Sequence, residues 1–246
     1  LLDSERFITF LLDLVQHGLR AMSVAERRMF RMFWLTVKPN DDGSDWFREA
    51  AGFLHALRSV LPLRSECLDI LKIRYDRIDF VDEPLAGDLD LPLDVYASYS
   101  RDQLFAALDV PKPASIREGV KHLPDKKLDV LLVTLHKSED DYTPTTMYRD
   151  YSINERLFHW QSQSTTSAES ETGMRYIEHG RRGYRVLLFV RDFKVDQASG
   201  LASPYTFLGT ANYVRHEGSR PMSIVWKLDR PIPARFLKKT NRLVVG

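Results

Sequence analysis

Apolar side chains recur every three or four residues in the first third of the chain, a spacing typical of amphipathic helices. The first such stripe runs from Phe7 to Leu14 and lies inside a helix predicted over residues 4–20. The same spacing predicts three further helices, over residues 23–38, 44–61 and 63–78. We interpret all four stripes as core-facing, so this part predicts structure and no chemistry.

Two local signals mark helix starts and a third marks a boundary. Ser23 with Glu26, and Ser100 with Gln103, have the spacing of capping boxes, in which each side chain binds a free backbone amide at a helix start. Residues 79–94 are acidic and hold two prolines and a glycine, which indicates a connector. We therefore place a domain boundary near residue 93.

Beyond that boundary the pattern changes to short apolar or alternating runs, which predict strands. These runs span residues 95–99, 128–135, 157–163, 184–193, 205–214 and 222–228. Short helices are expected after Ser100 and around residues 170–179. The predicted fold class is α+β: a helical subdomain over 1–93, then a small, partly closed β-barrel with flanking helices over 94–246.

Composition limits the functional class. The chain has 246 residues, 43% of them hydrophobic and 28% charged, as in ordinary globular proteins. No run of eighteen apolar residues and no signal-peptide pattern occurs, so we expect no membrane partner. The single cysteine, Cys67, rules out an internal disulfide and fits a reducing compartment, and we expect a cytoplasmic location. Because the sequence starts at Leu1 and not at Met, we expect it to be part of a longer chain.

The net charge of +1 conceals an asymmetry. Residues 1–95 carry 12 basic and 17 acidic side chains, whereas residues 172–246 carry 14 basic and 5 acidic ones. A basic C-terminal third indicates an anionic partner, with nucleic acid the leading candidate. A merely solubilising surface is an equally good interpretation of charge alone.

Catalytic motifs are missing from the sequence. It contains no Walker A loop, no dinucleotide-binding glycine pattern, no nucleophile elbow and no closely spaced histidine pair among its seven histidines. The acidic triplet 139–141 is interpreted as a solvated loop. We therefore predict no catalytic residues, no metal and no cofactor, and expect that this chain by itself is not an enzyme.

Three stretches combine aromatic rings with hydroxyls, amides or guanidinium groups: residues 96–101, 142–151 and 158–167. An aromatic face stacks on a base, while amides and hydroxyls read the polar edge of that base. The third stretch, FHWQSQSTTS, is interpreted as one wall of a pocket for a flat polar ring. The alternative is that its aromatic residues are core and the remainder is an ordinary loop.

Five stretches carry a resemblance to a known family: ASYSRDQLFAAL, KKLDVLLVTLHKSEDDYTPTTMYRDY, LFHWQSQSTTS, VLLFVRDF and PYTFLGTANYVRHEGSRPMSIVWKL. They resemble an uncharacterised bacterial domain at the C-terminal end of superfamily-two (DEAD/DEAH-type) helicases, which often carry a phospholipase-D-like nuclease. The order of segments after residue 157 also resembles PUA-like barrels of the SRA kind, which bind nucleic acid and often flip a base.

The resemblance implies a reader of DNA, either unmodified or modified, that acts within a helicase or nuclease chain of the restriction or phage-defence type. The implied base-pocket residues are Tyr96, Tyr99, Tyr151, His159, Trp160, Gln161, Ser162 and Gln163. The implied phosphate-binding residues are Ser100, Arg101, Arg181, Arg182, Arg191, Arg215, Arg220, Lys238 and Lys239. Helicase and nuclease domains of the same chain are the implied partners. Two alternatives stay open: a protein-docking or oligomerisation domain, and a nuclease domain.

Overall fold

The computed structural model describes residues 3–78, 83–84, 89–113, 119–136, 150–196, 200–234 and 236–237. The chain divides into two compact units, Leu1–Arg117 and Glu118–Gly246. The first unit thus extends beyond the boundary predicted near residue 93. Helices followed by a sheet confirm the predicted mixture of helical and β structure.

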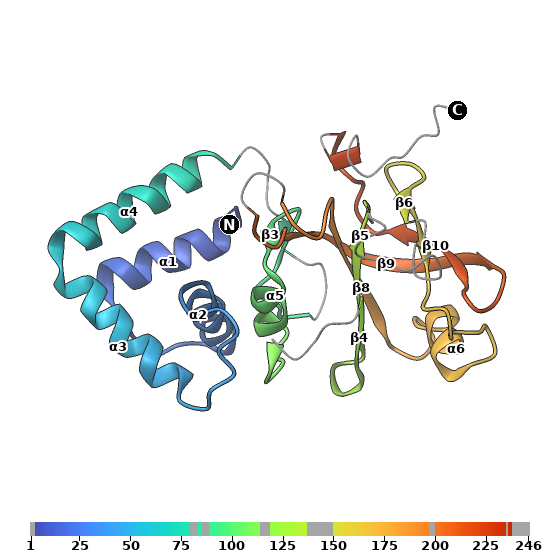
Figure 1. Ribbon diagram of the computed structural model, residues 1–246, viewed down its shortest axis with the longest axis horizontal. Helices are drawn as coiled ribbons and strands as arrows, with labels where there is room; N and C mark the ends of the chain where they lie inside the picture. Colours follow the sequence, from blue (N-terminus) through green and yellow to red (C-terminus); the bar gives the residue numbers. More distant parts are fainter. Residues whose placement is uncertain are drawn as a thin grey trace. The chain divides into compact units, whose positions relative to one another are not determined.

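Four helices open the first unit (Figure 1): α1 Glu5–His17, α2 Val24–Val37, α3 Trp46–Ser59 and α4 Leu61–Asp76. Local hydrogen bonds explain where they begin. The Oγ of Ser4 accepts from the amide of Phe7, and Ser23 and Glu26 form the predicted capping box at the start of α2. The predicted stripes of α1, α2 and α3 are largely buried, with Phe30 and Leu54 almost fully enclosed. The interpretation of the fourth stripe as core-facing is wrong, because Leu71 is the one buried residue of α4 while Ile70 and Ile73 are about half exposed.

The remainder of the first unit holds short elements. They are β1 Glu83–Pro84, β2 Asp94–Val95, β3 Ser98–Tyr99 and α5 Arg101–Ala107. The single strand predicted over 95–99 is wrong, because Tyr96 has a left-handed backbone, with φ of 75°, and turns the chain between β2 and β3. Ser100 and Gln103 form the second predicted capping box, and α5 packs against α2.

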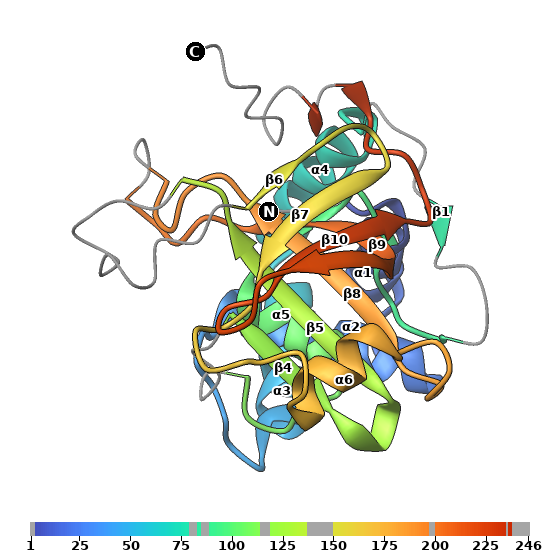
Figure 2. The same cartoon turned by 90° about the vertical axis from the view of Figure 1, so that its right-hand side faces the viewer.

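The second unit is built on one mixed sheet (Figure 2). Its strands are β4 Val120–Leu123, β5 Leu128–Thr134, β6 Tyr151–Ser152, β7 Leu157–Gln161, β8 Arg185–Arg191, β9 Tyr205–Glu217 and β10 Ser223–Leu228. The order across the sheet is β4-β5-β8-β9-β10-β7-β6, and only the β5–β8 pairing is parallel. Strands β5 and β8 match the two strongly apolar runs, and their central residues are buried on both faces.

The expected closed barrel is not what the described residues form. Among them, β4 pairs with β5 alone and β6 with β7 alone, so the sheet is open. These two edge strands are four and two residues long, and short edges are a common way to end a sheet without closing it. The pairing of β8 with β9 contains a bulge at Gly209. The φ of Gly209 is 90°, a left-handed backbone conformation that glycine adopts without strain.

One helix of the second unit, α6 Glu171–Ile177, begins at Ser170, whose Oγ accepts from the amide of Gly173. This bears out the helix expected around residues 170–179. The chain before α6 passes very close to it, because a Cβ added to Gly173 would lie 2.0 Å from the carbonyl oxygen of Ser167. The polar segment that follows β7 is therefore packed against α6 at this point.

Candidate nucleic-acid interface

Strand β7 separates the aromatic residues of FHWQSQSTTS onto two faces of the sheet. Side chains alternate along a strand, so Phe158 and Trp160 lie on one face, and His159 and Gln161 on the other. The first two are buried, with Trp160 only 4% exposed, whereas His159 and Gln161 are half-buried. The pocket wall predicted from this stretch is therefore split between core and surface.

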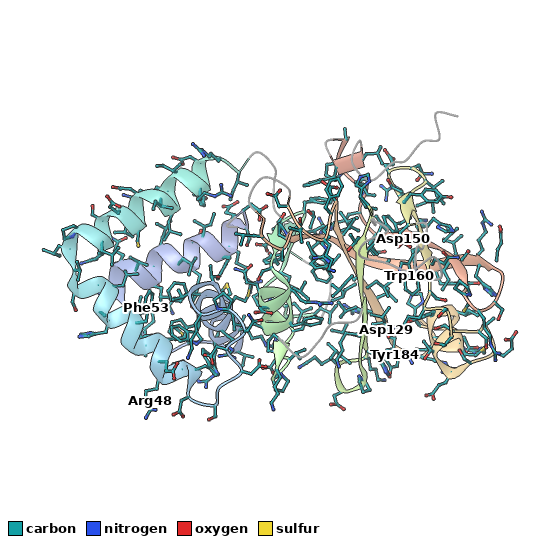
Figure 3. The ribbon with its side chains drawn as sticks, in the orientation of Figure 1. Arg48, Phe53, Asp129, Asp150, Trp160 and Tyr184 are labelled. Atoms are coloured by element: carbon teal, nitrogen blue, oxygen red, sulfur yellow. The ribbon has the colours of Figure 1, made fainter. Side chains whose placement is uncertain are left out.

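Trp160 belongs to an aromatic cluster beneath α6. Its ring meets Tyr176 edge-on at 5.5 Å and lies 6.4 Å from Trp226, and Trp226 also contacts His179 and Tyr213. Edge-to-face packing of this kind is typical of a hydrophobic core. Figure 3 shows Trp160 within the second unit. The expectation that Trp160 stacks on a base is corrected on this ground: its ring faces are covered by other side chains.

The opposite face presents a stacked pair of rings. Tyr151 on β6 and His159 on β7 are register partners, with ring centroids 4.9 Å apart and planes 16° from parallel. Both side chains are half-buried. Asp150, next to this pair, is buried and accepts a hydrogen bond of 2.9 Å from the backbone amide of Gln161. The structure thus brings Tyr151, His159 and Gln161, three of the residues predicted to form a base pocket, onto the face opposite Trp160.

The sheet register extends this face from β7 across β10 to β9. His159 lies opposite Val225, and Val225 lies opposite Arg215. In the adjacent row, Gln161 lies opposite Ser223. An aromatic pair, an amide, a hydroxyl and a guanidinium therefore occupy neighbouring positions on one side of the sheet. We call these residues, Tyr151, His159, Gln161, Arg215 and Ser223, the β7 face.

The remaining residues predicted to contact a base have structural roles. The Oγ of buried Ser162 accepts from the amide of Met222 at 2.9 Å, which ties β7 to the start of β10, and Gln163 is exposed just beyond. Tyr96 and Tyr99 belong to the first unit and are buried there. The Tyr99 hydroxyl accepts from the amide of Asp94, and burial, followed by the charge of Asp94, raises the pKa of Tyr99 well above its usual value.

Most of the predicted phosphate-binding arginines already have partners. Arg181 and Arg182 both pair with Glu178, and Arg215 pairs with Glu217. These pairs are at the surface, where an ion pair contributes about 0–1 kcal/mol and is easily exchanged.

Arg191 differs from the other arginines, because its Nε donates to Thr134 at 2.9 Å and its guanidinium lies 4.5 Å from the ring centre of Tyr205. This arginine therefore holds strands together. Arg220 is exposed on the turn before β10, and Arg101 is half-buried on α5. Ser100 caps α5. Lys238 and Lys239 lie outside the described residues.

A buried polar cluster escaped the sequence interpretation. The guanidinium of Arg175 on α6 makes two hydrogen bonds to Asp129 on β5, of 2.8 and 3.0 Å, and Asp129 is fully buried. Burial by itself would lower the pKa of Arg175, but the hydrogen bonds and charge of Asp129 hold it above its usual value. The available signal was Asp129 itself, an acid inside the apolar run Leu128–Thr134.

The edge of this cluster is more accessible. His122 on β4 is the register partner of Asp129, and its Nε2 lies 3.3 Å from the hydroxyl of Tyr184. Figure 3 labels Asp129 and Tyr184 in the same part of the sheet. Burial, followed by the positive charge of Arg175, lowers the pKa of His122, although Asp129 and Glu171 act in the opposite sense.

This shift gives a pH prediction. Because the pKa of His122 is lower in the folded state than in the unfolded state, the unfolded chain binds more protons below about pH 6.5, and stability falls there. We expect the free energy of unfolding of the wild type to decrease more than that of His122→Gln between about pH 8 and about pH 5. Denaturant titration of both proteins at the two pH values measures this difference. An equal decrease in both proteins would contradict the prediction.

Within the described ranges, no helix is long and apolar enough to cross a membrane. The same residues contain no group of three or more histidine, cysteine, aspartate or glutamate side chains placed to hold a metal ion.

The fold and the β7 face define a chain of the mixed helix-and-sheet class, with an aromatic and polar patch on an open sheet. Residues 93–239 match the family described as "Domain of unknown function (DUF3427)", and the chain belongs to this family. The match covers more than half of the chain and includes the whole sheet of the second unit. No curated protein matches the chain.

Proposed function

We propose that this chain is a nucleic-acid-binding module whose β7 face contacts the nucleic acid. The observation that carries the proposal is the stacked Tyr151–His159 pair, half-exposed on a sheet and in register with Arg215. Aromatic side chains on a sheet are stacking platforms for bases, and their π-faces accept every base.

The polar neighbours of the ring pair suit the same ligand. Gln161 has an amide that can donate and accept at one base edge, and Ser223 adds a hydroxyl in the same row. Arg215 supplies a cation for phosphate, because its exposed pair with Glu217 is weak enough to be exchanged for a phosphate oxygen. Binding of this kind weakens as the salt concentration rises, because the release of counterions from the phosphates becomes less favourable.

More specifically, we propose that the chain is the specificity module of a bacterial helicase or nuclease of the restriction or phage-defence type. Its DNA would carry a modified or flipped base, as in PUA-like and SRA-like readers, and the module would determine which DNA the rest of the chain attacks. What supports this form is the resemblance of the segments around Leu157–Gln161 and Tyr205–Leu228, together with the ring pair beside them. A flipped base costs a few kcal/mol of unstacking, which contacts such as these would have to offset.

The test is fluorescence anisotropy with labelled oligonucleotides: unmodified, methylated, hydroxymethylated and glucosylated duplexes, and single strands. Tyr151→Ala and His159→Ala are each expected to weaken binding about 5- to 100-fold, since stacking contributes about 1–3 kcal/mol per base. Tyr75→Ala, which removes a surface tyrosine of α4, is the matched control and is expected to bind as the wild type does.

Equal binding by Tyr151→Ala, His159→Ala and the wild type would show that the β7 face is not the interface. If the wild type bound none of the oligonucleotides, the proposal of a nucleic-acid-binding module would be wrong. Docking onto another protein domain would then be favoured. A specific observation supports that second function: Leu61, Leu63, Ile70 and Ile73 of α4 are between 47% and 70% exposed. Large apolar side chains exposed together on one helix favour a contact with another protein.

A further inference from the structure

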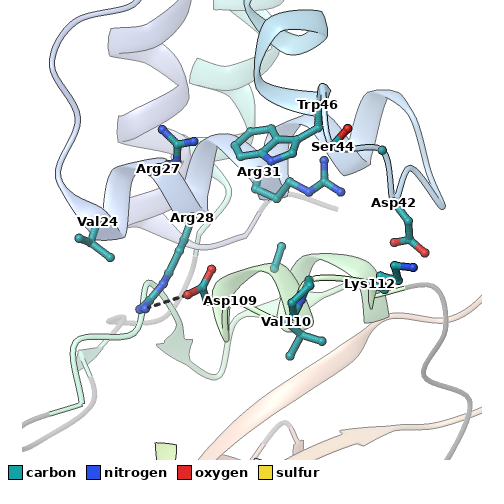
Figure 4. Close-up of a pocket in the computed structure, with 13 residues that line it drawn as sticks. Val24, Arg27, Arg28, Arg31, Asp42, Ser44, Trp46, Asp109, Val110 and Lys112 are labelled. Atoms are coloured by element: carbon teal, nitrogen blue, oxygen red, sulfur yellow. Dashed lines mark ion pairs between the residues drawn. The ribbon is translucent and has the colours of Figure 1, made fainter. Parts of the chain in front are cut away.

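A pocket lined by cations lies within the first unit (Figure 4). The residues of the β7 face belong to the second unit. The pocket has a volume of about 560 Å³ and is enclosed by α2, by residues 42–46 before and at the start of α3, and by residues 106–112 at the end of α5. Small-molecule sites in proteins have volumes of about 300–1,000 Å³, so this pocket could accommodate a nucleotide-sized ligand.

Four cations and two acids line this pocket. The cations are Arg27, Arg28, Arg31 and Lys112, and the acids are Asp42 and Asp109. Arg27 and Arg31 are one turn apart on α2, so both project from the same side of that helix. The lining therefore carries a positive excess even though the sequence around it, residues 1–95, is acidic.

The arginine groups are incompletely satisfied. Arg31 is 8% exposed, and its Nη2 donates to the backbone carbonyl of Asp41, but its Nη1 makes no hydrogen bond within the described part of the chain. Oδ2 of Asp41 is 3.9 Å from this Nη1. The buried Nε of Arg28 also has no hydrogen-bond partner among the described residues, although its Nη2 lies 3.8 Å from Asp109. Buried guanidinium donors without acceptors are costly, so each of these two nitrogens has a hydrogen bond to offer a ligand in the pocket.

The pocket holds its cations in a defined arrangement. The guanidinium of Arg31 lies 4.8 Å from the ring centre of Trp46, and that of Arg27 lies 5.7 Å from the same ring. Stacking on an aromatic face leaves the edge of a guanidinium, with its N–H groups, available to a ligand. Burial lowers the pKa of Arg31, and the charges of Asp41, Asp42 and Asp102 offset this effect only in part.

One acceptor is also unsatisfied: Oδ1 of Asp42 is buried and has no hydrogen-bond partner among the described residues. We propose that this pocket binds a small phosphate ester that also carries a hydroxyl or amino group, such as a nucleotide. In Figure 4, Arg28 and Arg31 point to different sides of the pocket, so they would contact different parts of the ligand. The phosphate would accept from Arg31 Nη1, a second acceptor of the nucleotide would accept from Arg28 Nε, and the hydroxyl or amino group would donate to Asp42 Oδ1. A dianionic phosphate matches several cations better than a single carboxylate does.

The test is isothermal titration of the full chain with inorganic phosphate, adenosine monophosphate, adenosine triphosphate and adenosine. We expect saturable binding of the phosphate-bearing ligands and none of adenosine. Arg28→Gln is expected to weaken nucleotide binding about 10- to 100-fold, because it removes a charged donor. Arg48→Gln, which changes an exposed arginine of α3 outside the pocket, is the matched control and should bind normally.

Arg31→Met is a second variant, but it removes a buried cation stacked on Trp46, so its far-UV circular dichroism must match the wild type before its affinity is interpreted. Lys112→Gln at the pocket rim provides a variant without that risk, with the same direction of effect. Equal affinities for Arg28→Gln, Lys112→Gln and Arg48→Gln would overturn the proposal, as would absence of binding to every phosphate compound.

One further ligand distinguishes a free nucleotide from the end of a nucleic acid as the source of the phosphate. A 5′-phosphorylated oligonucleotide that binds through Arg28 while free nucleotides do not would overturn the small-ligand proposal and assign the pocket to nucleic-acid ends. Tyr151→Ala is expected to leave nucleotide binding unchanged, because Tyr151 lies outside the pocket lining. The pocket and the β7 face can therefore fail independently.

Discussion

Replacing Arg175 by methionine is expected to lower the free energy of unfolding by about 3–5 kcal/mol, because it leaves the carboxylate of Asp129 buried without its countercharge. Asp129 is fully buried, and both of its oxygens accept from the Arg175 guanidinium. An unpaired charge at such a position cannot be solvated without opening the packing between α6 and β5. Denaturant unfolding monitored by tryptophan fluorescence measures the change.

The matched variant is the double substitution Asp129→Leu with Arg175→Met. It removes both charges and keeps apolar side chains of similar length, and replacing a whole buried pair in this way is often neutral or stabilising. We therefore expect the double variant to recover most of the stability that the single variant loses. If Arg175→Met alone unfolded at the same denaturant concentration as the wild type, the ion pair would have no structural importance.

Replacing Trp160 by alanine is expected to cost about 3–5 kcal/mol of stability, the range for removing a large aromatic side chain from a core. The indole fills the space between Tyr176 of α6 and Trp226 of β10, so its loss leaves a cavity beneath the helix. Thermal or denaturant unfolding checks this expectation. A stability loss below about 1 kcal/mol would contradict the placement of Trp160 in the core.

His159→Ala is the matched control, since His159 is adjacent to Trp160 on the same strand but lies on the other face. Surface substitutions away from the core usually change stability by no more than about 0.5 kcal/mol. We expect His159→Ala to remain folded and to lose nucleic-acid affinity, whereas Trp160→Ala loses stability first. This opposite pattern in two neighbouring residues separates a binding position from a core position.

The local features were predictable because their causes lie within a few residues. The capping boxes at Ser23 and Ser100 depend on a side chain and an amide three residues apart, and both formed as expected. The apolar runs that became β5 and β8 were evident because both faces of these strands are buried. The break at Tyr96 escaped prediction, since a left-handed tyrosine has no strong sequence signal.

The chemistry of the second unit depended on distant partners. Asp129 and Arg175 are 46 residues apart, and nothing local to either one indicates the pairing. The alternation in Leu157–Gln161 indicated two faces, but the burial of Trp160 depended on where α6 and Trp226 pack. The stack of Tyr151 on His159 likewise needed the pairing of β6 with β7.

By itself, the sequence determined the helical N-terminal part and the main strands, and it drew attention to the stretches that supply Tyr151, His159 and Gln161, because periodicity and capping act locally. Tertiary structure alone decided that the sheet is open, that Trp160 is core while His159 is on the β7 face, and that Arg28, Arg31 and Asp42 line one pocket. Whether a polar or aromatic group is buried, paired or accessible depends on which distant elements pack against it. The free energy of burying that group therefore cannot be read from any short segment.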